Sequence, residues 1–116
     1  MEHQAVYDRL VQAARAREFV HYDELAKMLG VDMTNEHWAV QVGKVLDPVN
    51  EAEVAAGRPM LSAIEVSKDT MLPGKGFFML GQQLRRTEPG EDEIGFAIRQ
   101  IKRVHEYWSQ EAAPSQ

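Results

Sequence analysis

The sequence predicts an α+β fold, a winged helix-turn-helix with a small β-hairpin wing and an additional carboxy-terminal helix. The first observation is a pair of helical runs, Tyr22–Leu29 and Trp38–Leu46, separated by a glycine and polar residues. The second is a strand-like run, Met60–Val66, followed by a loop rich in proline and glycine and a second apolar run, Phe77–Leu80. The third is a long amphipathic pattern near the carboxy terminus, from Ile94 to Trp108.

Composition limits the chain to one domain. Its 116 residues, 44% of them apolar, suffice for a single core, so we expect one winged-helix-like domain over residues 1–110 and a flexible tail over residues 111–116. No apolar run approaches the roughly 18 residues of a membrane span, and the amino terminus lacks a leader pattern. We therefore expect a soluble, cytoplasmic protein. The absence of cysteine excludes disulfides and thiolate chemistry.

The amino-terminal third contains two predicted helices and a short strand. Apolar residues recur every four positions within Gln4–Arg17, which predicts a helix with one buried face. Phe19–Val20 is too short to form a strand alone, but it is long enough to pair with one strand of the wing. Tyr22–Leu29 resumes helical spacing, and Gly30 is well placed to end that helix.

The next helix is the candidate recognition helix. Capping residues in Asp32–Asn35 open it, and we expect it to run to about Leu46. Asp47–Pro48 should end or kink it, because proline lacks the backbone donor and restricts the residue before it. Val49–Ala56 would add a further turn or two, and the acidic segment Asn50–Glu53 should face solvent. Its inward face is predicted to consist of Ala39, Val42 and Leu46.

The outward face of this helix offers side chains that read base edges. Asn35 and Gln41 could recognise adenine, and Lys44 could recognise guanine or contact phosphate. Nearby acidic residues, among them Asp32 and Asp47, would repel the DNA backbone. The alternative is a solvated helix whose polar residues only keep the domain soluble.

The predicted wing adds basic residues. Lys68 and Lys75 lie at the two ends of the loop between the strand-like runs, where they could approach phosphates, and Arg58 would assist from the preceding segment. In the alternative, Pro73 and the glycines that follow it only turn the chain, and the lysines protect the sheet edge.

The carboxy-terminal helix is predicted from an acidic start and a clean apolar stripe. Glu91, Asp92 and Glu93 suit a helix amino terminus. The stripe comprises Ile94, Ala97, Ile98, Ile101, Val104, His105 and Trp108. We expect it to dock either on the first helix or on a second subunit, which would make a homodimer.

Part of the pattern resembles a known family. Tyr22, Leu25, Ala26 and Gly30, with Val42–Leu46, resemble the carboxy-terminal domain of alkylguanine-DNA alkyltransferases and alkyltransferase-like proteins, over roughly half of the chain. The resemblance implies the helix-turn-helix fold. That family carries a Pro-Cys-His-Arg motif after the recognition helix and a helix arginine that extrudes the damaged base.

Neither of these functional features is present. The region of the motif reads Arg58-Pro59-Met60-Leu61-Ser62, without cysteine or histidine, and Val40 replaces the arginine. The sequence thus excludes alkyl transfer, and it lacks the arginine that would extrude a base from the DNA.

No pattern points to an enzyme, a metal or a cofactor. The four histidines have no ligand spacing, and no carboxylate pair lies in an apolar stretch where a raised pKa would be expected. Ser62 lacks the glycines of a nucleophile elbow, so we interpret it as a packing or hydrogen-bonding residue.

These observations predict a non-enzymatic winged-helix protein, a regulator that binds double-stranded DNA. Its predicted DNA-binding residues are Asn35, Gln41, Lys44, Arg58, Lys68 and Lys75. The net charge of −5 opposes generic binding to polyanions and supports an alternative, an acidic winged-helix-shaped protein interaction module without DNA binding.

Overall fold

A computed structural model describes residues 3–111 of the chain. These residues form five α-helices, one short 3-10 helix and a sheet of two short strands. The elements are α1 (Gln4–Arg15), β1 (Val20–His21), α2 (Tyr22–Leu29), α3 (Trp38–Ala55), η1 (Leu61–Ile64), β2 (Glu65–Val66), α4 (Lys75–Gln83) and α5 (Glu93–Glu111). The protein is therefore mostly helical, and the predicted α+β class is confirmed at that level.

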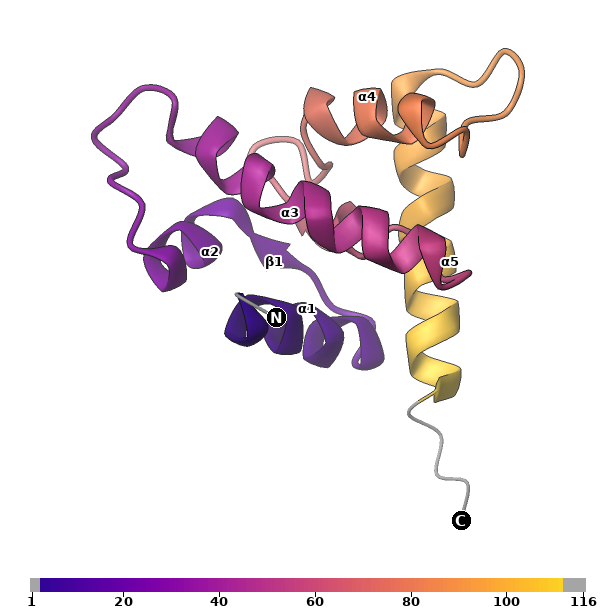
Figure 1. Cartoon of the computed structure of the whole chain (residues 1–116), viewed down its shortest axis with the longest axis horizontal. Coiled ribbons are helices and arrows are strands. Elements are labelled where there is room, and N and C mark those ends of the chain that lie inside the picture. Colours follow the sequence, from indigo (N-terminus) through magenta and orange to yellow (C-terminus); the bar gives the residue numbers. More distant parts are fainter. Residues whose placement is uncertain (1–2, 112–116) are drawn as a thin grey trace.

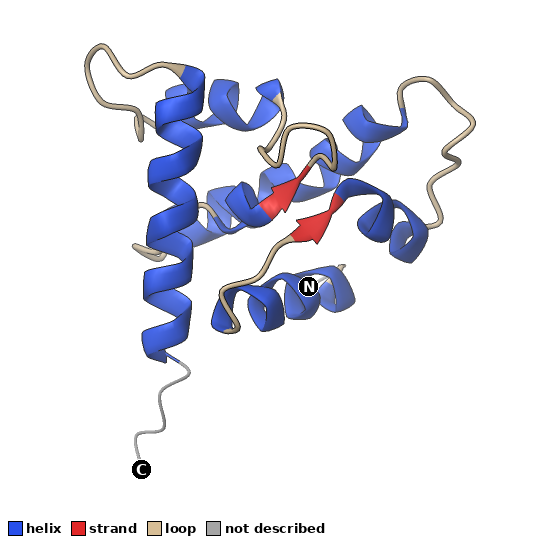
Figure 2. Ribbon diagram, turned by 180° about the vertical axis from the view of Figure 1, so that it is seen from behind, coloured by secondary structure: helices blue, strands red, loops and turns tan. Residues whose placement is uncertain are grey.

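The helices surround a small central sheet. In Figure 1, α3 crosses the molecule between α1 and α4, and α5 runs along one side. Figure 2 shows the two strands side by side next to α1. The core contains residues from every helix and from η1, so the elements form one packed unit.

Helices α1 and α5 pack against each other. This is one of the two arrangements predicted for the carboxy-terminal helix. The two helices contact each other directly, and α5 buries Val104 and Trp108. Two residues of the predicted stripe behave differently, because Ile94 and Ile98 are 55% and 56% exposed. Phe96 takes their place in the core and is fully buried.

The sheet joins the segment after α1 to the segment after η1. β1 pairs with β2 in parallel, with Val20 opposite Glu65 and His21 opposite Val66. The expectation of a short strand near Phe19–Val20 is thus confirmed, within one residue. Its partner lies in the Met60–Val66 run that was predicted to carry the first wing strand.

The predicted hairpin itself is wrong. Only Glu65–Val66 of the first apolar run is extended, and Leu61–Ile64 forms the 3-10 helix η1. Phe77–Leu80 lies inside the helix α4, where Phe77 and Leu80 are buried three positions apart. Met79 between them is 57% exposed, so the four residues form a short apolar run whose sequence cannot distinguish a helix from a strand.

Helix α2 has its predicted bounds, and Gly30 ends it in the left-handed conformation with a φ of 69°. Helix α3 begins later than predicted, at Trp38, and continues through Pro48 to Ala55. Proline removes only the hydrogen bond to the carbonyl four residues earlier. Val42, Leu46 and Val49 are buried on either side of it, and this packing holds the helix together.

Two further expectations for α3 are corrected. Ala39, predicted to face inward, is exposed. Asn50 and Glu53, predicted to face solvent, are 1% and 0% exposed, because the uninterrupted helix turns them toward η1 and α1. The loop between α2 and α3 spans residues 30–37, longer than the turn of about three to four residues in the usual helix-turn-helix.

No helix within residues 3–111 is long and apolar enough to cross a membrane. The tail expected from Glu111 onward falls, beyond Glu111 itself, outside the described residues.

Candidate functional site

A pocket of about 500 Å³ opens between the first half of α3 and the turn that leads into α4. Val40, Lys44 and Leu46 of α3 border it on one side, and Phe77 of α4 borders it on the other. Helices α3 and α4 contact each other, which fixes the two walls. A pocket of this size falls in the range of roughly 300–1,000 Å³ that holds small organic ligands.

Glu65 is the unusual group in this pocket. It lies on β2, lines the pocket, and is only 3% exposed. Its Oε2 atom has no hydrogen-bond partner among the described residues. Burial raises the pKa of the Glu65 carboxyl from 4.5 to about 9, although the neighbouring Tyr22 hydroxyl favours the carboxylate and opposes the shift. Glu65 is therefore protonated at neutral pH and able to donate a hydrogen bond.

Tyr22 connects the start of α2 to the turn before α4. Its hydroxyl accepts a hydrogen bond from the backbone N–H of Gly74 at 2.5 Å. A Cβ atom at Gly74 would lie 2.9 Å from that hydroxyl, so the close approach requires glycine. Burial and the nearby Glu65 raise the pKa of Tyr22. Tyr22 is thus a neutral, positioned hydroxyl on the pocket wall.

Asn50 and Ser62 form a buried pair that also borders the pocket. The Asn50 Nδ2 donates to the Ser62 Oγ at 2.6 Å, and the Ser62 backbone N–H donates to the Asn50 Oδ1 at 3.0 Å. The two bonds join α3 to η1 and confirm the interpretation of Ser62 as a hydrogen-bonding residue. Among the residues that line the pocket, Glu65 has the buried polar atom without a partner.

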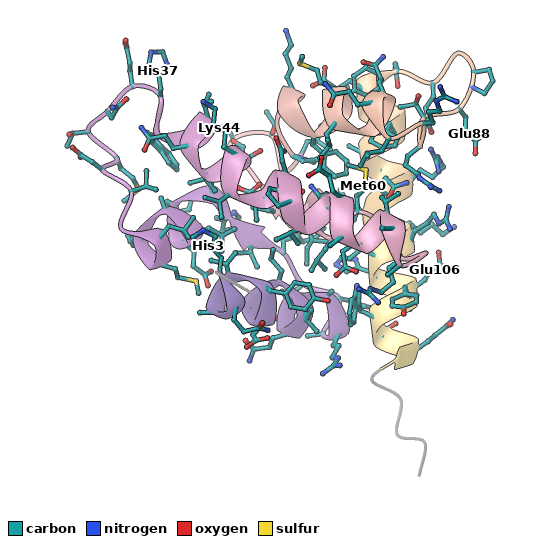
Figure 3. The ribbon with its side chains drawn as sticks, in the orientation of Figure 1. His3, His37, Lys44, Met60, Glu88 and Glu106 are labelled. Atoms are coloured by element: carbon teal, nitrogen blue, oxygen red, sulfur yellow. The ribbon has the colours of Figure 1, made fainter. Side chains whose placement is uncertain are left out.

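Charged side chains surround the opening. Lys44 extends from α3 and Lys75 from the start of α4, both exposed and both bordering the pocket. Figure 3 shows Lys44 on the side of α3 that faces away from α1. Asp47 also borders the pocket, and burial together with Glu51 raises its pKa. No ion pair among residues 3–111 joins either lysine to an acid, so both remain available to an anionic ligand.

Of the six predicted DNA-binding residues, the structure places Lys44 and Lys75 at the same pocket, and Gln41 lies one helical turn before Lys44 on the same side of α3. Gln41 is exposed on α3, near Lys44 in sequence. Asn35 lies in the loop before α3, where its Oδ1 accepts a hydrogen bond from the backbone N–H of His37 at 2.8 Å.

Arg58 and Lys68 are engaged elsewhere. Arg58 follows the far end of α3, and its guanidinium pairs with the buried Glu53 carboxylate. Lys68 pairs with Asp23 of α2 at 2.7 Å. Helix α3 rises about 1.5 Å per residue. The 18 residues of α3 therefore extend about 27 Å, and Arg58 and the Asn35 loop follow its opposite ends.

Sequence reasoning missed Glu65 and Asn50 as site residues, and it read Tyr22 only as part of a helix face. A signal for Glu65 was present, because it is a single carboxylate between Ile64 and Val66 in a run that is otherwise apolar or small. A charged residue in such a run is either exposed on a strand edge or buried in a structural or functional role. Only the fold shows that it is buried.

The described residues contain no group of three or more histidine, aspartate or glutamate side chains arranged to hold a metal ion. The Ser62 hydroxyl accepts a hydrogen bond from an amide, which cannot act as a base. The arrangement in the pocket is therefore suited to binding through hydrogen bonds and charge.

Comparison with known proteins adds no assignment. No family model, curated protein or solved structure matches this chain. The resemblance to alkyltransferases therefore stays an expectation from the residues quoted for it. The function has to be inferred from the pocket and from the charged groups around it.

Proposed function

We propose that this protein is a non-enzymatic binding protein whose pocket holds a small organic ligand. The observation that carries the proposal is the Oε2 atom of the Glu65 carboxyl, which has no hydrogen-bond partner among the described residues and is buried on the wall of a pocket of about 500 Å³. A pocket with apolar walls and a few convergent polar groups, one with a strongly shifted pKa, is the usual form of a ligand site.

The buried Oε2 atom of Glu65 is unfavourable for the empty protein. A buried polar group without a hydrogen bond costs about 1–3 kcal/mol, and an apolar residue in its place would avoid that penalty. The same group becomes favourable when a ligand supplies the missing partner. Asn50 and Ser62, which are equally buried, satisfy each other and therefore fill a structural role instead.

A fragment screen tests the proposal. We expect several small molecules, tested at millimolar concentration, to shift the backbone amide signals of Tyr22, Gly43 and Phe77 in NMR spectra of the 15N-labelled chain. The matched control is Ala39→Trp, which fills the pocket from an exposed position on α3. Shifts that survive in Ala39→Trp, or no shift from a fragment of any charge class, would contradict ligand binding at this site.

A second candidate function is DNA binding, with α2 and α3 as the helix-turn-helix of a winged-helix-related scaffold. The observation that favours it is the exposure of Gln41 and Lys44 on one side of α3, with Lys75 at the same pocket as Lys44. These residues provide one amide and two cations for base edges and phosphates. Asn35 would join them from the preceding loop.

Fluorescence anisotropy with a labelled duplex tests this second function. We expect binding at micromolar protein that weakens between about 50 and 150 mM salt, because each phosphate contact releases counterions. Replacing Lys44 and Lys75 together by glutamine should reduce the salt slope by about 2. The control replaces the exposed Lys102 and Arg103 of α5 by glutamine. Equal losses in the two double variants would remove this interface.

A further inference from the structure

Resting on the proposed ligand site, we propose that its ligand is a small anion with an uncharged amide or lactam head. The head meets the Glu65 carboxyl at the inner end of the pocket, and the anionic group meets Lys44 and Lys75 at the opening. Three separate features of the pocket support this assignment: its inner polar group, its walls and its charged rim.

The inner end selects an uncharged partner. Glu65 is 3% exposed, and its neighbours along the pocket are apolar or already hydrogen-bonded. A cationic head would require a carboxylate in these surroundings, and the removal of both charges from water would offset much of their attraction. A protonated carboxyl offers one donor and one acceptor side by side. The adjacent C=O and N–H of a lactam match both.

The walls limit the body of the ligand. Leu46 and Phe77 border the pocket and are 2% and 7% exposed, while Val40 borders it at the surface with 56% exposure. These side chains present apolar surface between the Glu65 carboxyl and the rim. A small ring or a short hydrocarbon segment would fill that space and release water from it.

The rim selects an anion. Lys44 and Lys75 contribute two positive charges there and Asp47 contributes one negative charge. The excess of one positive charge attracts a single carboxylate or similar group, and flexible lysine side chains can close on it from α3 and α4. A cation without an anionic group would be repelled at the rim and would meet a neutral carboxyl inside.

Four probes built on a five-membered ring separate these features. Pyroglutamate carries the lactam and the anion, 2-pyrrolidinone only the lactam, cyclopentanecarboxylate only the anion, and proline an ammonium with the anion. NMR titration of the 15N-labelled chain at pH 7 should give the tightest binding for pyroglutamate, with a Kd in the low millimolar range. Each of the other three probes should bind at least about threefold more weakly.

Variants assign each contact to its residue. Glu65→Gln keeps a donor and an acceptor, so pyroglutamate should bind within about threefold of the parent protein, whereas Glu65→Leu should weaken it by about tenfold or more. Lys44→Gln with Lys75→Gln should weaken pyroglutamate to the level of 2-pyrrolidinone and leave 2-pyrrolidinone unchanged. Lys102→Gln on α5 is the control for general charge. A dispersed amide spectrum confirms that each variant is folded.

The outcomes distinguish the ligand class from the site. If proline or cyclopentanecarboxylate binds as tightly as pyroglutamate, or Glu65→Leu binds pyroglutamate like the parent, the lactam assignment is overturned. If pyroglutamate shows no shift while other fragments bind at the pocket, the site stands and the ligand class is wrong. If no fragment of any class binds there, both proposals fail together.

Discussion

Glu65 shows how one residue can be unfavourable for stability and still define the site. Its carboxyl is buried on β2 beside Tyr22, where the ionised form loses hydration without gaining a cation. In contrast, the buried Glu53 has Arg58 as its partner. The two carboxylates have similar burial, and only the one beside the pocket lacks a countercharge.

The stability of the protein should therefore fall as pH rises. The pKa of Glu65 is raised from 4.5 in the unfolded chain to about 9 in the folded chain. Its contribution is complete below pH 4.5 and is lost as pH rises toward 9, by up to about 1.4 kcal/mol per pH unit. Urea unfolding at pH 6 and pH 8.5 should show that Glu65→Gln loses about 2–3 kcal/mol less than the parent. The control is Glu51→Gln at an exposed position, and parallel losses in all three proteins would contradict the burial of an ionisable Glu65.

Arg58 and Lys68 were both predicted to bind DNA, but each pairs with an acidic side chain in the structure. The two ion pairs should therefore contribute to stability, and by different amounts. Removing the cation from the buried Glu53 in Arg58→Gln should destabilise the protein by about 3 kcal/mol. Lys68→Gln breaks an exposed pair with Asp23 and should cost less than about 1 kcal/mol. Chemical denaturation measures both. If the two variants were equally stable, Arg58 would be free for another role.

At the scale of elements, helix α4 is the main difference between expectation and structure. Pro73 and Gly74 do turn the chain, but they lead into a helix, with Gly74 as its N-cap residue. Gly81 then lets α4 approach α5, because a Cβ atom there would collide with the ring of Phe96. Gly74, which was predicted to turn a hairpin, instead begins a helix, and Gly81, which lies outside the predicted loop, allows the close packing of α4 on α5.

Two glycine substitutions, one at the contact between α4 and α5 and one on the surface of α3, should have opposite effects on stability. Gly81→Ala should destabilise the protein by about 1–3 kcal/mol, because Phe96 is fully buried and cannot move aside without disturbing the core. Gly43→Ala on α3, where no atom lies within 4 Å of the added Cβ, should stabilise it by up to about 1 kcal/mol. Thermal unfolding measures the pair. A neutral Gly81→Ala would show that α4 does not pack closely on Phe96.

In the molecule as a whole, one face of α5 is not covered by any other element within residues 3–111. Ile94 and Ile98 are separated by one helical turn and lie on the same face, 55% and 56% exposed. The other face of α5 packs on α1. The homodimer expected from the apolar stripe thus requires these two residues, and the alternative of a protein interaction module would place its partner on the same surface.

Light scattering after size exclusion tests this association. We expect a dimer at about 100 μM protein and a monomer for Ile94→Glu with Ile98→Glu, because two charges in an apolar interface remain unpaired. Met28→Glu on α2, another exposed apolar position, is the control and should leave the dimer intact. A monomeric parent protein at this concentration would contradict self-association through α5.

The sequence by itself determined the elements with regular local patterns. The helical spacing of Tyr22–Leu29 and the stop at Gly30 predicted α2 with its observed bounds, and the apolar stripe predicted the helix α5 but left open whether it docks on α1 or on a second subunit. These predictions succeed because an amphipathic helix shows its buried face in every turn. The helical pattern also placed Lys44 on the exposed side of its helix, whereas Lys75 was predicted in a wing loop and lies instead at the start of α4.

Only the tertiary structure decided the segments whose short apolar runs have no clear periodicity, and with them the site. Between Met60 and Leu80, apolar runs and glycines are compatible with strands, with a 3-10 turn and with a helix, so the choice depends on packing against α3 and α5. The burial of Glu65 depends on the pairing of β2 with β1 and on the approach of α3 to α4. Those contacts join residues distant in the chain, and no local pattern in the sequence records them.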